Sequence, residues 1–87
     1  MVMAMVRVSG YEYYVRAREL AREVLEKVEP LVEGTPCPDR YYLSIRNKAL
    51  SVLERLAGVV DCEANKKYLQ RLYYEAKALH VRVFGRE

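Results

Sequence analysis

The side chains of this chain that could act as an acid, a base or a nucleophile are few and widely separated. His80 is the only histidine, and Cys37 and Cys62 are the only cysteines. A catalytic nucleophile and its base must lie within hydrogen-bonding reach of each other. No serine, cysteine or carboxylate occurs at a helical spacing that would bring it beside His80. The sequence therefore predicts no catalytic residue and a protein that is not an enzyme.

The sequence also predicts no metal site and no disulfide within one chain. Glu19 and Glu23 lie four residues apart and could form a carboxylate pair. A di-metal bundle site also needs a Glu-x-x-His motif on facing helices, which the chain lacks. Cys37 and Cys62 flank a predicted helix roughly 30 Å long, whereas a disulfide spans at most about 7 Å between α-carbons. We predict no metal, no cofactor and free thiols, with a disulfide between two subunits as the alternative.

The tyrosines are better suited to binding than to catalysis. They form three doublets, Tyr13-Tyr14, Tyr41-Tyr42 and Tyr73-Tyr74. On a helix, neighbouring side chains point about 100° apart, so one ring of each doublet can enter the core while the other lies at the rim. Tyrosine is enriched at protein interfaces, and it stacks on nucleic-acid bases when basic residues lie nearby. The doublets therefore indicate either the amphipathic rims of an ordinary bundle surface or a binding surface.

The elements that position these residues begin with a pattern that occurs twice. Residues 13–28 return as residues 41–56, with seven of the sixteen positions identical. The repeat predicts two successive helices that offer the same kind of apolar face and play similar packing roles.

Helical periodicity and capping signals predict three helices, at about residues 10–29, 39–60 and 62–84. Ser9-Gly10-Tyr11-Glu12 has the form of a capping box. Pro30 cannot donate a backbone hydrogen bond, so the first helix is expected to end or kink near Glu29. Asp61 can cap the third helix.

Three Glu-to-basic pairs at a spacing of four residues are predicted to stabilise these helices, by about 0.2–0.5 kcal/mol each. They are Glu12–Arg16, Glu23–Lys27 and Glu63–Lys67.

The second predicted helix carries two parallel apolar seams. One consists of Tyr42, Ile45, Ala49, Val52, Leu56 and Val59, and the other of Leu43, Leu50, Leu53, Ala57 and Val60. A face this wide contacts two neighbours, which predicts that this helix is the centre of the architecture. The predicted fold class is all-α, an antiparallel three-helix bundle with up-down-up order. It forms a single domain over residues 9–87, preceded by a flexible leader at residues 1–8.

Residues 48–53 and residues 74–79 resemble two segments of the microtubule-interacting-and-transport (MIT) domain, a three-helix module that works with membrane-remodelling ATPases. Residues 48–53, Lys-Ala-Leu-Ser-Val-Leu, are similar to the part of that family's second helix that carries a small residue. Residues 74–79, Tyr-Glu-Ala-Lys-Ala-Leu, are similar to the Ala-x-x-Leu segment near the end of its third helix. The link at residues 30–39 is longer than the short turn of the family.

The resemblance, over about residues 13–83, implies a groove between the second and third helices that receives a partner's helix or extended tail. The side chains that it places at this groove are Leu50, Leu53, Leu72, Ala76, Leu79 and Val83.

We predict a small helical module that binds a protein partner or a second copy of itself as a homodimer. Apolar residues make up 52% of the 87 residues, more than a chain of this size can bury, which favours self-association. The predicted surface combines the second seam of the second helix with the edge of the third. Its residues are Leu50, Leu53, Leu72, Tyr73, Ala76, Leu79, His80 and Phe84.

The alternative prediction is a nucleic-acid-binding protein. Residues 1–33 carry a net charge of −1, whereas residues 40–87 carry +5. A basic surface attracts phosphates in a salt-dependent way. The residues assigned to this surface are Arg46, Lys66, Lys67, Arg71, Tyr74, Lys77 and Arg82.

The remaining expectations concern habitat and compartment. Charged residues are abundant and Asn and Gln are limited to Asn47, Asn65 and Gln70, a composition typical of thermophiles and archaeal-like in character. No run of 18 apolar residues occurs, so we expect no membrane span and a cytoplasmic protein.

Overall fold

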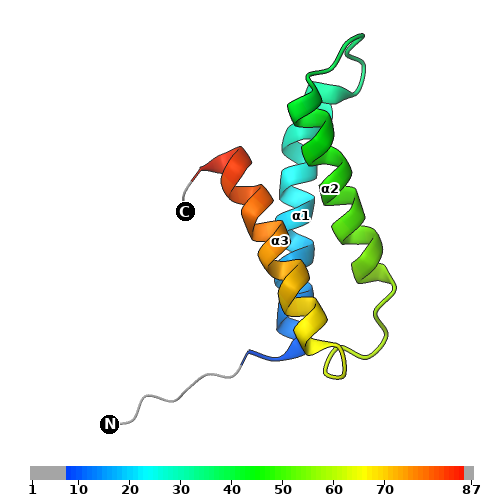
Figure 1. The fold of residues 1–87 in the computed structure, drawn as a ribbon, viewed down its shortest axis with the longest axis vertical. Helices are drawn as coiled ribbons and strands as arrows, with labels where there is room; N and C mark the ends of the chain where they lie inside the picture. The colour runs from blue at the N-terminus through cyan, green and yellow to red at the C-terminus, as the bar shows by residue number, and fades with distance from the viewer. Residues whose placement is uncertain (1–7, 86–87) are drawn as a thin grey trace.

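The computed structural model describes residues 8–85 and contains three helices, α1 (Gly10–Val32), α2 (Arg40–Ala57) and α3 (Lys66–Phe84). Successive helices run in opposite directions (Figure 1), and no strand occurs among the described residues. The predicted all-α, antiparallel three-helix bundle is confirmed. Residues 1–7, which make up most of the predicted leader, lie outside the described part of the chain.

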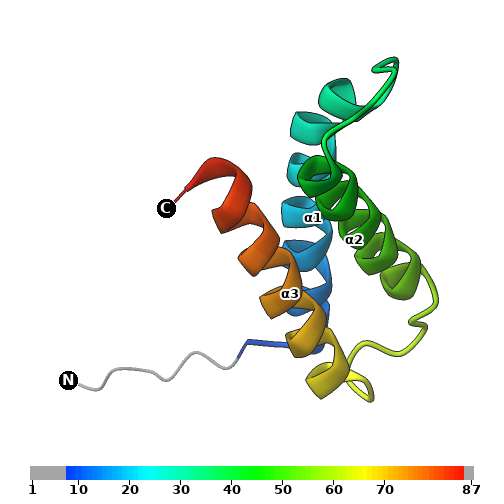
Figure 2. The ribbon, with the colours of Figure 1, turned by 45° about the horizontal axis from the view of Figure 1, so that its top comes forward.

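The central helix is α1, so the prediction that α2 occupies the centre is wrong. α1 packs extensively against both other helices, whereas α2 and α3 have the least contact with each other. Figures 1 and 2 both show α2 and α3 in front of α1. Ala17 and Ala21 of α1 have no exposed surface, and such small side chains let a neighbouring helix approach closely. Much of the second seam of α2 is left uncovered, and Leu50 is 39% exposed.

The repeated pattern corresponds to matching core faces on α1 and α2. Four pairs of equivalent positions are buried, namely Ala17 and Ile45, Ala21 and Ala49, Val24 and Val52, and Val28 and Leu56. α3 adds Leu69, Leu72, Ala76 and Leu79 to the same core. The prediction that the two repeats play similar packing roles is confirmed at these positions.

The first helix continues past Pro30, so its predicted end near Glu29 is wrong. A proline inside a helix removes one backbone hydrogen bond. The bonding resumes beyond it, because the N–H of Glu33 donates to the carbonyl of Glu29 at 2.8 Å. The additional turn buries Val32 and leaves Leu31 43% exposed. Burial of Val32 favours continuing the helix across the proline.

The predicted limits of the other two helices are too wide. α2 ends at Ala57 instead of residue 60, and Gly58, a poor helix former, is its C-cap. α3 begins at Lys66 instead of residue 62. Asp61 does accept a hydrogen bond from the N–H of Ala64 at 3.0 Å, but it caps a separate turn over residues 62–65.

The N-terminus of α1 is fastened to the connection between α2 and α3. Ser9 caps α1 by accepting a hydrogen bond from the N–H of Glu12 at 3.1 Å. The N–H of Gly10 donates to a carboxylate oxygen of Glu63 at 2.6 Å. Gly10 is buried, and a Cβ at this position would collide with the backbone carbonyl of Cys62. A close backbone contact therefore closes this end of the bundle.

Of the three predicted Glu-to-basic pairs, the described residues show one. Glu12 lies 3.7 Å from Arg16. Glu63 bonds to the backbone of Gly10, and Glu23 contacts His80 of α3. The predicted Glu23–Lys27 and Glu63–Lys67 pairs are thus replaced by contacts between segments distant in sequence.

Candidate binding surfaces

A groove with a cavity volume of about 350 Å³ runs between α2 and α3. Its walls consist of Lys48, Ser51 and Arg55 from α2 and Glu75, Ala78, Leu79 and Arg82 from α3. The groove exists because both helices pack mainly against α1 and little against each other. Ala78 is exposed, whereas Leu79 is only 5% exposed. The groove therefore combines an apolar lining with charged rims.

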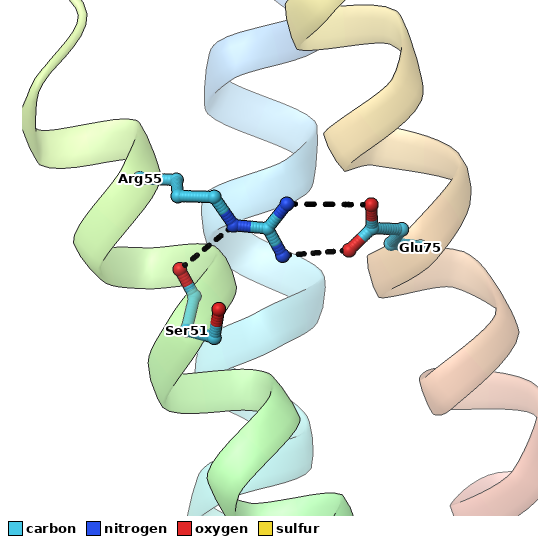
Figure 3. A network of polar contacts seen from close by, with 3 residues as sticks. All are labelled: Ser51, Arg55 and Glu75. Atoms are coloured by element: carbon cyan, nitrogen blue, oxygen red, sulfur yellow. Dashed lines mark hydrogen bonds and ion pairs between the residues drawn. The ribbon is translucent and has the colours of Figure 1, made fainter.

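An ion pair bridges this groove. Nη2 of Arg55 lies 2.7 Å from Oε1 of Glu75, and Nη1 lies 3.4 Å from Oε2 (Figure 3). Nε of Arg55 also donates to the backbone carbonyl of Ser51 at 3.4 Å. The hydrogen bond to Glu75 is the main cause that raises the pKa of Arg55 above its usual value, so the guanidinium remains charged. The two side chains are 38% and 47% exposed, and such pairs contribute only about 0–1 kcal/mol to stability.

The groove continues along α2 into a second hollow. This hollow is lined by Arg40, Leu43, Ser44 and Asn47, and it shares Lys48 and Ser51 with the groove. Across the two hollows, four basic residues face one acidic residue, Glu75, which Arg55 already neutralises. The combined surface is therefore electropositive.

Part of the predicted partner surface lies inside the core. Leu72 and Ala76 have no exposed surface, because they pack against Ala17 and Ala21 within the same cluster. The structure corrects their assignment to a binding surface. Leu79 also belongs to the core, but it reaches the lining of the groove.

The other predicted partner residues lie on different sides of the bundle. Leu53 lines a hollow together with Tyr14 and Arg18 of α1. Phe84 lines another hollow with three residues of α1. Leu50 is exposed but lines neither. The eight residues therefore do not form one continuous surface.

His80 has a carboxylate partner that its own helix does not supply. Its Nε2 lies 2.7 Å from Oε1 of Glu23 on α1, and its ring stacks on Phe84 with a centroid separation of 4.4 Å. Local spacing cannot reveal this contact, because it crosses between helices. Among residues 8–85, no group of three His, Cys, Asp or Glu side chains is placed to hold a metal ion.

A separate hollow of about 320 Å³ lies on α3 and is lined by Lys67, Gln70, Arg71 and Tyr74. The ring centroid of Tyr74 is 5.4 Å from that of Tyr73, which is 5.7 Å from that of Tyr13 on α1. The hollow shares no residue with the groove. It is a second, independent surface of the bundle.

The residues of the predicted nucleic-acid surface are only partly together. Lys67, Arg71 and Tyr74 line the hollow on α3. Lys77 lies over the ring of Tyr73, with Nζ 5.8 Å from the centroid. The others are placed elsewhere: Arg82 lines the groove, Lys66 begins α3, and Arg46 lies on α2 with its Nε shielded from solvent.

The two cysteines are both free. Cys37 is exposed and Cys62 is half-buried. The connections that contain them lie at opposite ends of the bundle (Figure 1).

Comparisons with protein-family models, with curated proteins and with solved structures found no match for this chain. No helix within the described residues is long and apolar enough to cross a membrane.

Proposed function

We propose that this protein is a binding module whose groove between α2 and α3 receives an acidic, amphipathic helix of a partner protein. The observation that carries the proposal is the combination of basic rims and apolar lining in one groove. Amphipathic helices bind such grooves through apolar side chains at intervals of three and four residues. The resemblance to the MIT domain implies a partner site between the same pair of helices, although of the six residues that it places there only Leu79 lines the groove.

The lining residues have separate tasks in this proposal. Ala78 and Leu79 supply the apolar contact, which provides most of the affinity. Lys48 and Arg82 attract and orient acidic side chains, because charges at the rim act mainly on association rate and specificity. Arg55 can exchange the carboxylate of Glu75 for one of the partner at little cost in stability, since their pair is exposed.

A displayed library of 16-residue peptides tests this function. Peptides are selected on the wild-type protein alone, and the affinity of the selected peptides is then measured on the Ala78→Glu variant, which places a carboxylate in the groove. We expect enrichment of Asp and Glu interspersed with Leu and Ile at helical spacing. Ala78→Glu should weaken the selected peptides at least tenfold, equivalent to about 1.4 kcal/mol.

Val81→Glu is the matched control, because Val81 is also an exposed residue of α3 but does not line the groove. Equal weakening by the two variants would contradict the proposed site. A dimer in light scattering that Ala78→Glu dissociates would instead identify a second copy of the chain as the occupant.

Removal of the acidic charge from the groove should strengthen binding. Glu75→Gln frees Arg55 and makes the groove more positive by one charge, so we expect about three- to tenfold tighter binding of an acidic peptide and a steeper loss with added salt. Isothermal titration at two salt concentrations measures both effects. Glu54→Gln is the control, because Glu54 is exposed on α2 and lines neither hollow. Weaker binding by Glu75→Gln would show that the carboxylate belongs to the binding site itself.

A further inference from the structure

The hollow on α3 contains an aromatic ring that is both accessible and held in place. Tyr74 is 55% exposed. Its ring contacts that of Tyr73, which in turn contacts that of Tyr13 on the neighbouring helix. Lys77 lies over the ring of Tyr73, the middle ring of these three. A ring supported in this way loses little rotamer freedom when a flat ligand stacks on it.

The charges around this ring are all of one sign. Lys67 and Arg71 lie on the same face of α3, one helical turn apart, and Gln70 offers an amide between them. No acidic residue lines the hollow. None of the ion pairs found in residues 8–85 involves Lys67 or Arg71. Both side chains are therefore available to an anion.

We propose that this hollow binds single-stranded nucleic acid, with a base stacked on Tyr74 and the neighbouring phosphates bound by Lys67 and Arg71. Single strands are bound by this pairing of aromatic ring and basic side chains, because every base has a flat face and every nucleotide a negative charge. Bases in a duplex do not present their faces. The proposal is independent of the binding groove, since the two surfaces share no residue.

An acidic protein segment would use the same two basic residues but would not need an exposed ring. An oligonucleotide without bases distinguishes the two cases, because it keeps the phosphates and removes the stacking partner. The probes are fluorescently labelled 15-nucleotide thymidine and uridine strands, an abasic strand of the same length, and a duplex. Their binding is measured by fluorescence anisotropy at low salt.

We expect the wild-type protein to bind the thymidine or uridine strand about tenfold more tightly than the abasic strand and the duplex. Tyr74→Ala should lower affinity for the base-containing strands about tenfold, within the range for loss of one stacking ring, leave abasic binding unchanged, and so abolish the difference. Tyr41→Ala is the matched control, because Tyr41 is also half-exposed and contacts its doublet neighbour, Tyr42. Equal binding of base-containing and abasic strands by the wild-type protein would overturn the proposal, as would an equal loss in Tyr41→Ala.

The phosphate contacts have their own readout. Each of Lys67→Ala and Arg71→Ala should reduce the slope of log affinity against log salt concentration by about 0.7. Arg22→Ala, which removes an exposed basic residue of α1, should leave this slope unchanged. If all three variants change the slope equally, the binding is a general attraction to a basic protein and the assignment to this hollow is wrong. The thymidine and uridine strands together show whether DNA, RNA or both are bound.

Discussion

Gly10→Ala should lower the free energy of unfolding by about 2–3 kcal/mol. This loss is at the upper end of the roughly 1–3 kcal/mol that an added methyl or methylene group typically costs in a well-packed site. The added methyl group would meet the backbone of Cys62, lying 2.6 Å from its carbonyl carbon. Backbone atoms cannot rotate away as a flexible side chain can. The connection between α2 and α3 must therefore shift, which also strains the 2.6 Å hydrogen bond from Gly10 to Glu63.

Thermal unfolding followed by circular dichroism measures this effect. For a domain of this size, 2–3 kcal/mol corresponds to a fall in Tm of about 8–24 °C. Gly58→Ala is the matched control, since its nearest neighbour is 3.7 Å away and its φ of −86° suits alanine. It should change stability by less than about 1 kcal/mol. An unchanged Tm in Gly10→Ala would show that α1 does not lie against this connection.

Leu72→Ala should cost about 3 kcal/mol of stability. Leu72 is completely buried, and truncation of a buried leucine removes apolar contact and leaves a cavity, typically at 2–5 kcal/mol. The change lies in the cluster where α1, α2 and α3 meet, so the whole bundle is affected. Urea unfolding should show a lower midpoint with an unchanged slope.

Leu50→Ala provides the comparison for Leu72→Ala. Leu50 is 39% exposed on α2, and we expect its truncation to cost less than about 1 kcal/mol, since much less apolar surface is lost from the core. The two leucines were both assigned to a partner surface from the sequence, so the pair of variants separates core from surface directly. Equal losses would contradict the burial of Leu72.

Features of the fold that depend on local pattern were predictable. Tyr14, Ala17, Ala21, Val24, Val28 and Leu31 follow the helical period, which predicts the buried face of α1 correctly from Ala17 to Val28, whereas Leu31 is 43% exposed. Ser9 is at the N-cap of α1, as the capping box predicts, because capping depends on residues two or three positions away. The repeat pointed to equivalent core positions for the same reason.

Features that depend on which helices meet were not predictable from local pattern. The repeats offer similar faces, yet α1 has Ala17 where α2 has Ile45, and the smaller residue belongs to the helix that contacts both neighbours. Periodicity records where apolar residues lie, but not how closely two helices can approach. For this reason the prediction that α2 is the central helix is wrong.

At the candidate sites too, contacts between helices could not be predicted from local spacing. The contact of His80 with Glu23 joins residues 57 positions apart, and that of Arg55 with Glu75 joins residues 20 positions apart. The contact with His80 takes the place of the predicted Glu23–Lys27 pair, since pairs within one helix are worth only a few tenths of a kcal/mol. No pair within one helix is predicted for Arg55 or Glu75. The basic rims of the groove arise from the packing of α2 beside α3, which local spacing does not determine.

The position of α1 behind both walls of the groove has a consequence for the range of partners. The two walls are anchored separately to α1 and are joined across the gap by an exposed ion pair, Arg55–Glu75. Small sideways movements of either wall therefore disturb few contacts between them. For the partner helix proposed above, we therefore expect the groove to accept helices of different width, with discrimination among them resting on the order of charges along the helix rather than on the size of its apolar side chains.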